Sequence, residues 1–110
     1  MSELADPLFL MTNLYPASTG LPMVIWCGPS YGVGHDVRIK VSMAHGNRMD
    51  PSNLAEVALR PQPHVVAGHL SAADLRAVSQ WLALNEAAVL DHWNAAIDGV
   101  GLVQRLRRLP

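Results

Sequence analysis

The chain has 110 residues, a formal net charge of −1 and a single cysteine, Cys27. Its length is that of one ordinary domain, so we expect a single domain spanning residues 1–110, and its 50% hydrophobic content excludes a disordered chain. The near-zero charge removes the simplest argument for binding nucleic acid or an anionic membrane, and a lone cysteine excludes an internal disulfide.

The first two thirds of the chain are rich in proline and glycine and are typical of short strands. After a loose lead-in over residues 1–7, the β region covers residues 8–70. We expect an antiparallel sheet of three to five strands, because short sequential strands with short connections favour that arrangement. The expected strands lie at about 8–15, 22–27, 36–44, 55–60 and 64–70.

Two of these strands have clear patterns. The run from Met23 to Cys27 is apolar throughout, which predicts a strand buried on both faces. In the strand at 36–44, apolar and polar residues alternate, which predicts one face toward the core and one toward solvent. The outward face carries Arg38, Lys40 and Ser42.

Residues 71–110 form the helical region. Ser71 and Asp74 have the spacing of a capping box, and apolar residues then recur within a sector about 100° wide. This predicts a long helix over about 72–98 that packs on the sheet, with a break at Asn85 as the alternative. The stripe comprises Leu75, Val78, Leu82, Val89, Trp93 and Ile97. A short terminal helix is expected at 101–109, with Leu102, Val103 and Leu106 facing inward.

The location of the protein follows from what the chain lacks. No stretch reaches the ~18 consecutive apolar residues of a membrane helix. Glu3 and Asp6 occupy the region where a signal peptide would be positively charged. We therefore expect a soluble, cytoplasmic protein that does not engage a membrane.

Catalytic chemistry finds little support in the residue pattern. None of the five histidines is spaced like a zinc ligand pair, and His92 is expected on the outer side of the helix stripe. Cys27 lies inside an apolar run, where burial suppresses thiol reactivity. The segment Gly28–Gly34 lacks the Gly-Lys-Ser/Thr ending of a phosphate loop and is interpreted as an inter-strand connection. We expect no metal and no cofactor.

Basic residues offer one candidate surface. Arg38 and Lys40 share a strand face, and Arg105, Arg107 and Arg108 cluster near the C-terminus. Together they could bind phosphates, although the strand face carries no interleaved aromatic residue for base stacking.

Glu86 is the residue that does not fit the helix pattern, because it falls on the core-facing stripe. Three explanations are open: the helix breaks there, Glu86 pairs with a basic group such as a C-terminal arginine, or part of the stripe is exposed. Exposure would leave Leu82, Val89 and Trp93 available to another chain.

The helical region resembles a known family. The residues Trp81-Leu82-Ala83-Leu84-Asn85, then Val89-Leu90, Trp93-Asn94, Ile97-Asp98 and the segment 102–106 resemble the C-terminal signature of small bacterial proteins catalogued as domain of unknown function 4160. The resemblance extends over about residues 20–109 and implies a few strands followed by a long helix. Of the family's paired histidines, His35 matches the first, and Val37 replaces the second. The family brings no established activity, and its association with mobile or toxin–antitoxin-like gene pairs implies a protein partner.

These observations give one leading hypothesis and two alternatives. The leading hypothesis is a non-enzymatic interaction module that binds a second copy of itself or one protein partner. Its candidate contact residues are Arg38, Lys40, Glu86, Trp93, Arg105, Arg107 and Arg108. The alternatives are a nucleic-acid-binding accessory protein that uses Arg38, Lys40 and the C-terminal arginines, and a small metal-dependent hydrolase that uses His35.

Overall fold

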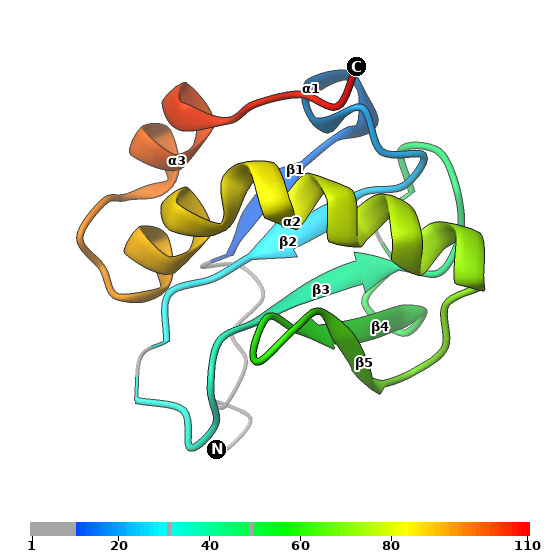
Figure 1. The fold of residues 1–110 in the computed structure, drawn as a ribbon, viewed down its shortest axis with the longest axis horizontal. Helices are drawn as coiled ribbons and strands as arrows, with labels where there is room; N and C mark the ends of the chain where they lie inside the picture. The colour runs from blue at the N-terminus through cyan, green and yellow to red at the C-terminus, as the bar shows by residue number, and fades with distance from the viewer. Residues whose placement is uncertain (1–10, 31, 49) are drawn as a thin grey trace.

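The computed structural model describes residues 11–30, 32–48 and 50–110 of an α+β fold. A five-stranded antiparallel sheet lies under one long helix, and a short helix packs beside that long helix (Figure 1). The fold class therefore agrees with the prediction. In chain order the elements are β1 (Thr12–Leu14), α1 (Pro16–Thr19), β2 (Ile25–Cys27), β3 (Arg38–Ser42), β4 (Leu54–Ala58), β5 (His64–Ala67), α2 (Ala72–Trp93) and α3 (Gly99–Arg105).

The sheet is a meander in which each strand pairs with the next along the chain, in the order β1-β2-β3-β4-β5. All five predicted strands are present and are shorter than expected. The lead-in at 1–7 and the first part of the predicted strand at 8–15 lie outside the described residues. One irregularity occurs between β4 and β5, where Glu56 pairs with Ala67 and Val57 with Val65, so that Val66 forms a bulge.

The core lies between α2 and the sheet face that α2 covers. Alternate strand residues point into it, and the apolar stripe of α2 closes it from the other side. Its fully buried members include Leu14, Ile25, Ile39, Val41 and Val57 from the strands and Val78, Trp81, Leu82 and Val89 from α2.

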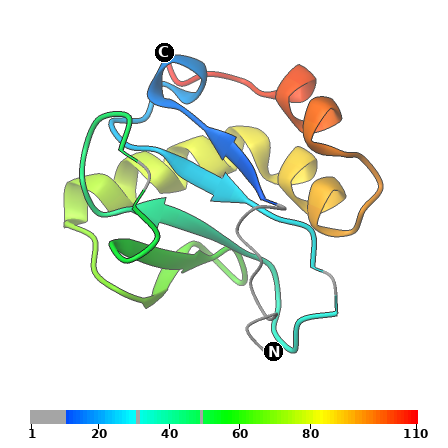
Figure 2. The ribbon, with the colours of Figure 1, turned by 180° about the vertical axis from the view of Figure 1, so that it is seen from behind.

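The opposite face of the sheet, seen from behind in Figure 2, is less exposed than the strand pattern predicts. Val24 and Trp26 are buried, which confirms that the 23–27 run is enclosed on both sides. Lys40 and Ser42, predicted to face solvent, are buried as well, with exposed fractions of 7% and 1%. The physical reason is that Lys40 lies in the central strand, flanked by Trp26 on β2 and Glu56 on β4. Alternation assigns a residue to a face of the sheet but does not determine its exposure.

Helix α2 begins as predicted and ends earlier. The backbone N–H of Asp74 donates to Ser71 Oγ at 3.0 Å, so the capping box is present. The helix runs without a break through Asn85 and stops at Trp93 instead of about residue 98. Asn94 caps it, and Ala95 then takes a positive φ of 60°, which turns the chain away. Within the described part of the chain, the helices are too short or too polar to traverse a bilayer.

The buried stripe of α2 agrees only in part with the predicted one. It keeps Val78, Leu82 and Val89 and also contains Trp81, Asn85, Ala88 and His92. Asn85 occupies its centre with 2% exposure, and Glu86 is on the surface. Leu82 and Val89 are fully enclosed, so the third explanation, in which this part of the stripe is open to another chain, is wrong at those two positions. The helix neither breaks at Glu86 nor buries it, because an amide with suitable partners fills the core position instead.

The chain after α2 returns along the same helix. Helix α3 buries Leu102, whereas Val103, predicted to face inward, is 50% exposed. Residues 106–110, which we call the C-terminal strap, are extended rather than helical and run back toward α1 (Figure 1). There the N–H of Leu109 donates to the Thr19 carbonyl at 2.8 Å.

Candidate functional site

The cations predicted on the sheet face are held in an ion-pair cluster. Glu56 accepts from Arg38 at 3.1 Å with one carboxylate oxygen, and its other oxygen lies 3.3 Å from Lys40 Nζ. Burial, the largest single influence, favours the neutral acid, but the attraction of Lys40 and the hydrogen bonds from both cations outweigh it. The pKa of Glu56 is therefore lowered. Glu56 offsets one of the two positive charges, so the cluster keeps a net charge of only +1 with which to attract phosphates.

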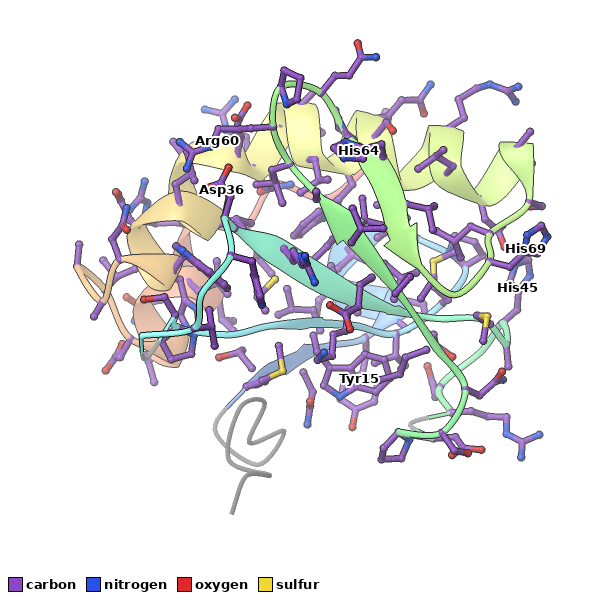
Figure 3. The ribbon with its side chains drawn as sticks, turned by 90° about the horizontal axis from the view of Figure 1, so that it is seen from below. Tyr15, Asp36, His45, Arg60, His64 and His69 are labelled. Atoms are coloured by element: carbon purple, nitrogen blue, oxygen red, sulfur yellow. The ribbon has the colours of Figure 1, made fainter. Side chains whose placement is uncertain are left out.

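Four of the histidines lie at or near the surface: His35, His45, His64 and His69. His35 bonds through Nδ1 to the Asp36 carbonyl at 2.8 Å, and its ring centroid is 5.8 Å from that of Trp93. Its neighbour Asp36 forms an ion pair with Arg60, and the two side chains meet at the end of the sheet where β3 begins and β4 ends (Figure 3). The residues that the structure describes contain no group of three or more metal-binding side chains. The hydrolase hypothesis centred on His35 thus gains no ligand set from the fold.

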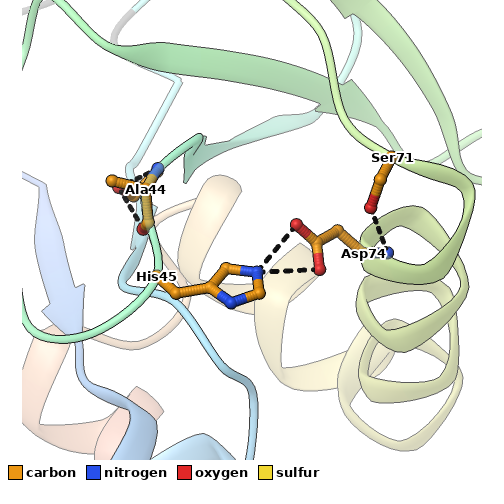
Figure 4. Close-up of polar contacts among 5 residues, drawn as sticks. Ala44, His45, Ser71 and Asp74 are labelled. Atoms are coloured by element: carbon orange, nitrogen blue, oxygen red, sulfur yellow. Dashed lines mark hydrogen bonds and ion pairs between the residues drawn. The ribbon is translucent and has the colours of Figure 1, made fainter.

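His45 has a structural partner. Its Nε2 lies 3.0 Å from each carboxylate oxygen of Asp74 in the first turn of α2 (Figure 4). The contact joins the β3–β4 connection to the same turn that Ser71 caps. It fastens a loop to a helix start, and the carboxylate also suits the positive end of the helix dipole.

His92 is the histidine whose predicted position is wrong. It was expected on the outer side of α2, but it is 4% exposed and bonds through Nε2 to Thr12 Oγ1 of β1 at 3.2 Å. Its Nδ1 has no partner at hydrogen-bond geometry within the described residues. It lines a cavity of about 620 Å³ between β1 and the α2–α3 turn, whose walls include Thr12, Pro29, Ile97, Asp98 and Gly99.

Burial is the main influence on His92 and lowers the pKa of its imidazole below the ordinary 6.5. The backbone of Gly28 and the carboxylate of Asp98 act in the opposite direction without cancelling this effect. The ring is therefore neutral at pH 7, where its Nε2 contacts Thr12 Oγ1 and its Nδ1 has no hydrogen-bond partner among the described residues.

A pH titration of stability tests this placement. The unfolded chain takes up a proton at His92 near pH 6.5, whereas the folded chain does so only at lower pH, so acidification favours unfolding. The free energy of unfolding is expected to fall as the pH drops below 6.5, and His92→Gln should flatten that slope. His69→Gln, at an exposed position, is the matched control. Equal slopes for wild type and His92→Gln would contradict the assignment.

Cys27 is a core residue, as the sequence predicts. It is 1% exposed, and burial raises the pKa of its thiol to about 12. A thiol of that pKa carries almost no thiolate at neutral pH and is unreactive.

The C-terminal arginines do not form one patch of unpaired charge. Arg105 pairs with Asp91 of α2 at 2.7 Å, and Arg108 donates to the Ala17 carbonyl at 3.1 Å. Arg107 differs, because its backbone is held by Asn85 while its guanidinium has no hydrogen-bond partner within the described residues. All three arginines are exposed, and Arg107 differs from the others only in this guanidinium, which is unpaired among the described residues.

Near residues 83–87 the outer face of α2 carries apolar side chains and lies between two grooves. Leu84 is 43% exposed, and Ala83 and Ala87 beside it are also on the surface. On one side is a groove of about 330 Å³, the strap groove, lined by Leu84, Asn85, Ala87, Ala88, Arg105 and Arg107. On the other side is a groove of about 200 Å³, the hairpin groove, lined by Leu59, Pro61, Gln62, Pro63, Ser79, Leu82, Ala83 and Glu86.

Glu86 stands at the rim of the hairpin groove. It makes no hydrogen bond or ion pair with the described residues. It interacts electrostatically with Arg60, which is already paired with Asp36. The C-terminal arginine that the sequence offered as its partner is on the far side of α2. Trp93 is half-buried at the end of the helix against His35 and is separate from this face.

The structure therefore brings together only part of the predicted contact set. Arg38 and Lys40 meet Glu56 on the sheet, and Arg105, Arg107 and Glu86 flank the outer face of α2. Leu84, the exposed leucine between them, was missed, although its place outside the apolar stripe was visible in the sequence. No family model, curated protein or solved structure matches the chain.

Proposed function

We propose that the protein is a non-enzymatic interaction module that contacts another protein chain through the outer face of its helical layer. The observation that carries the proposal is the exposure of apolar side chains on the two packed helices: Leu84 of α2 is 43% exposed, and Val100 and Val103 of α3 are 64% and 50% exposed. Exposed apolar residues with charged residues at their margins are typical of protein contact surfaces.

Two other candidate regions support the proposal because their charged groups have partners within the chain. Arg38 and Lys40 face a carboxylate, and His45 faces Asp74. The resemblance to the family of unknown function 4160 adds an independent reason to expect a protein partner, in a bacterial or toxin–antitoxin-like setting.

Site-specific crosslinking tests the proposal. A photoreactive amino acid at position 84 is expected to give one discrete protein adduct in cells that express the chain. The same group at Asn47, exposed on the β3–β4 connection, should give none. The adduct at position 84 should disappear when Ala87→Arg places a charge on the same face. Labelling that is absent at position 84, or equal at both positions, would contradict the proposal.

A further inference from the structure

The two sides of α2 are complementary to each other. The strap side presents an exposed apolar side chain, Leu84, next to the outward guanidinium of Arg107. The hairpin side presents a groove whose walls are mainly apolar, with the carboxylate of Glu86 at its rim. One side therefore offers a projecting leucine and a cation, and the other a recess and an anion.

Leu84 and Arg107 on the strap side lie at the same level along the helix as Glu86 on the hairpin side. Leu84 and Glu86 are two residues apart, about 3 Å along the axis. Arg107 is held at that level by Asn85, which bonds both its N–H and its carbonyl, at 2.7 and 2.9 Å. Figure 1 shows the strap and α3 on one side of α2 and the β4–β5 hairpin on the other, with the helix's outer face between them.

We propose that the partner at this face is a second copy of the chain, with the two α2 helices packed side by side in parallel about a two-fold axis. This inference rests on the proposed function. A two-fold axis along the helix direction places the strap side of each copy against the hairpin side of the other. Leu84 of each copy then enters the hairpin groove of the other, and Arg107 of each copy meets Glu86 of the other.

The surface chemistry favours this arrangement over an antiparallel one. An antiparallel two-fold would bring strap against strap, so that arginines would face arginines and the two grooves would face each other. Ala83 and Ala87 allow the helix axes to approach closely. Arg76 lies on the same outer face, about 10 Å before Ala83, so the helices cross near Ala83–Ala87 and diverge toward their N-termini.

Charge reversal tests both the partner and its orientation. Sedimentation equilibrium of the full chain is expected to show a monomer–dimer equilibrium, which Glu86→Arg or Arg107→Glu alone weakens about tenfold, since each change turns two attractions into repulsions. The double variant Glu86→Arg/Arg107→Glu restores both pairs and should recover most of the lost affinity. Both side chains are exposed, so the fold is expected to persist, and circular dichroism verifies it.

Arg48→Glu is the control, since it changes the net charge as Arg107→Glu does, at an exposed position on the β3–β4 connection. It should leave the equilibrium unchanged. A wild-type chain that is monomeric at every concentration overturns the proposal, and so does a dimer that the double variant fails to restore. If the chain is monomeric while position 84 still crosslinks to a different protein, this inference fails and the proposed function stands. If neither is observed, both fail.

Discussion

Asn85→Ala is expected to lower the free energy of unfolding by about 2–4 kcal/mol. The Asn85 side chain is 2% exposed and makes three hydrogen bonds. Its Nδ2 donates to the carbonyls of Trp81 and Arg107, each at 2.9 Å, and its Oδ1 accepts from the Arg107 N–H at 2.7 Å. Alanine removes all three and leaves both backbone groups of Arg107 without their protein partner. Chemical denaturation gives the stability change, and hydrogen exchange at Arg107 and Leu109 should accelerate because the strap is released.

Asn85→Asp separates the loss of these bonds from the loss of volume. A carboxylate keeps the acceptor for the Arg107 N–H but faces the two carbonyl oxygens to which the amide donates. At neutral pH this variant should be less stable than Asn85→Ala, and it should recover relative to wild type near pH 4, where the protonated acid can donate. Gln80→Ala, an exposed amide on the same helix, should change stability by less than about 0.5 kcal/mol. A stable Asn85→Ala variant with unchanged exchange at the strap would contradict this role.

Asn85 also shows where sequence reasoning reaches its limit. The apolar period predicts α2 and its capped start, since both depend on neighbours within one or two turns. The polar residue at the centre of the buried stripe is satisfied by Arg107, 22 positions away. Hydrophobic periodicity contains no information about such a partner, so the predicted stripe includes the position of Glu86 and leaves that residue unexplained. On a helical wheel, Asn85 is surrounded by Val78, Trp81, Ala88 and His92, all of which are buried. Their positions could have corrected the placement of the stripe.

In the sheet and in the candidate site, too, the sequence predicts local features but not the contacts between distant residues. The strand order follows from short connections, and the strand positions follow from alternation and from proline and glycine. Burial of Lys40 depends on its cross-strand neighbours Trp26 and Glu56, which only the register supplies. Likewise, Arg107 and Glu86 were both candidates, but their placement on opposite sides of α2 follows from the path of the strap. Single residues were predictable, and their combination into a face was not.

Gly68→Ala is the second change with a large expected effect, about 2–5 kcal/mol of destabilisation. Gly68 follows β5 and has a φ of +75°, which disfavours any residue with a Cβ. An added Cβ would also lie 2.6 Å from the Leu54 carbonyl oxygen and 2.7 Å from the Ala55 Cα. Both atoms belong to the backbone of β4, so no side-chain rotation relieves the clash, and β5 must separate from its neighbour.

Two other glycines separate the contributions of strain and contact. Gly46 has a φ of +92° with nothing within 4 Å of an added Cβ, so Gly46→Ala tests strain alone and should cost about 1 kcal/mol or less. Gly34 has open space and no positive φ, so Gly34→Ala should be neutral or slightly stabilising. Denaturation of the three variants under one condition measures the series. Equal costs at Gly68 and Gly46 would mean that β5 is not pressed against β4 as described. The β4–β5 connection forms one wall of the hairpin groove, and β5 holds that connection in place. The Gly68→Ala variant should therefore also lose the self-association proposed for that groove.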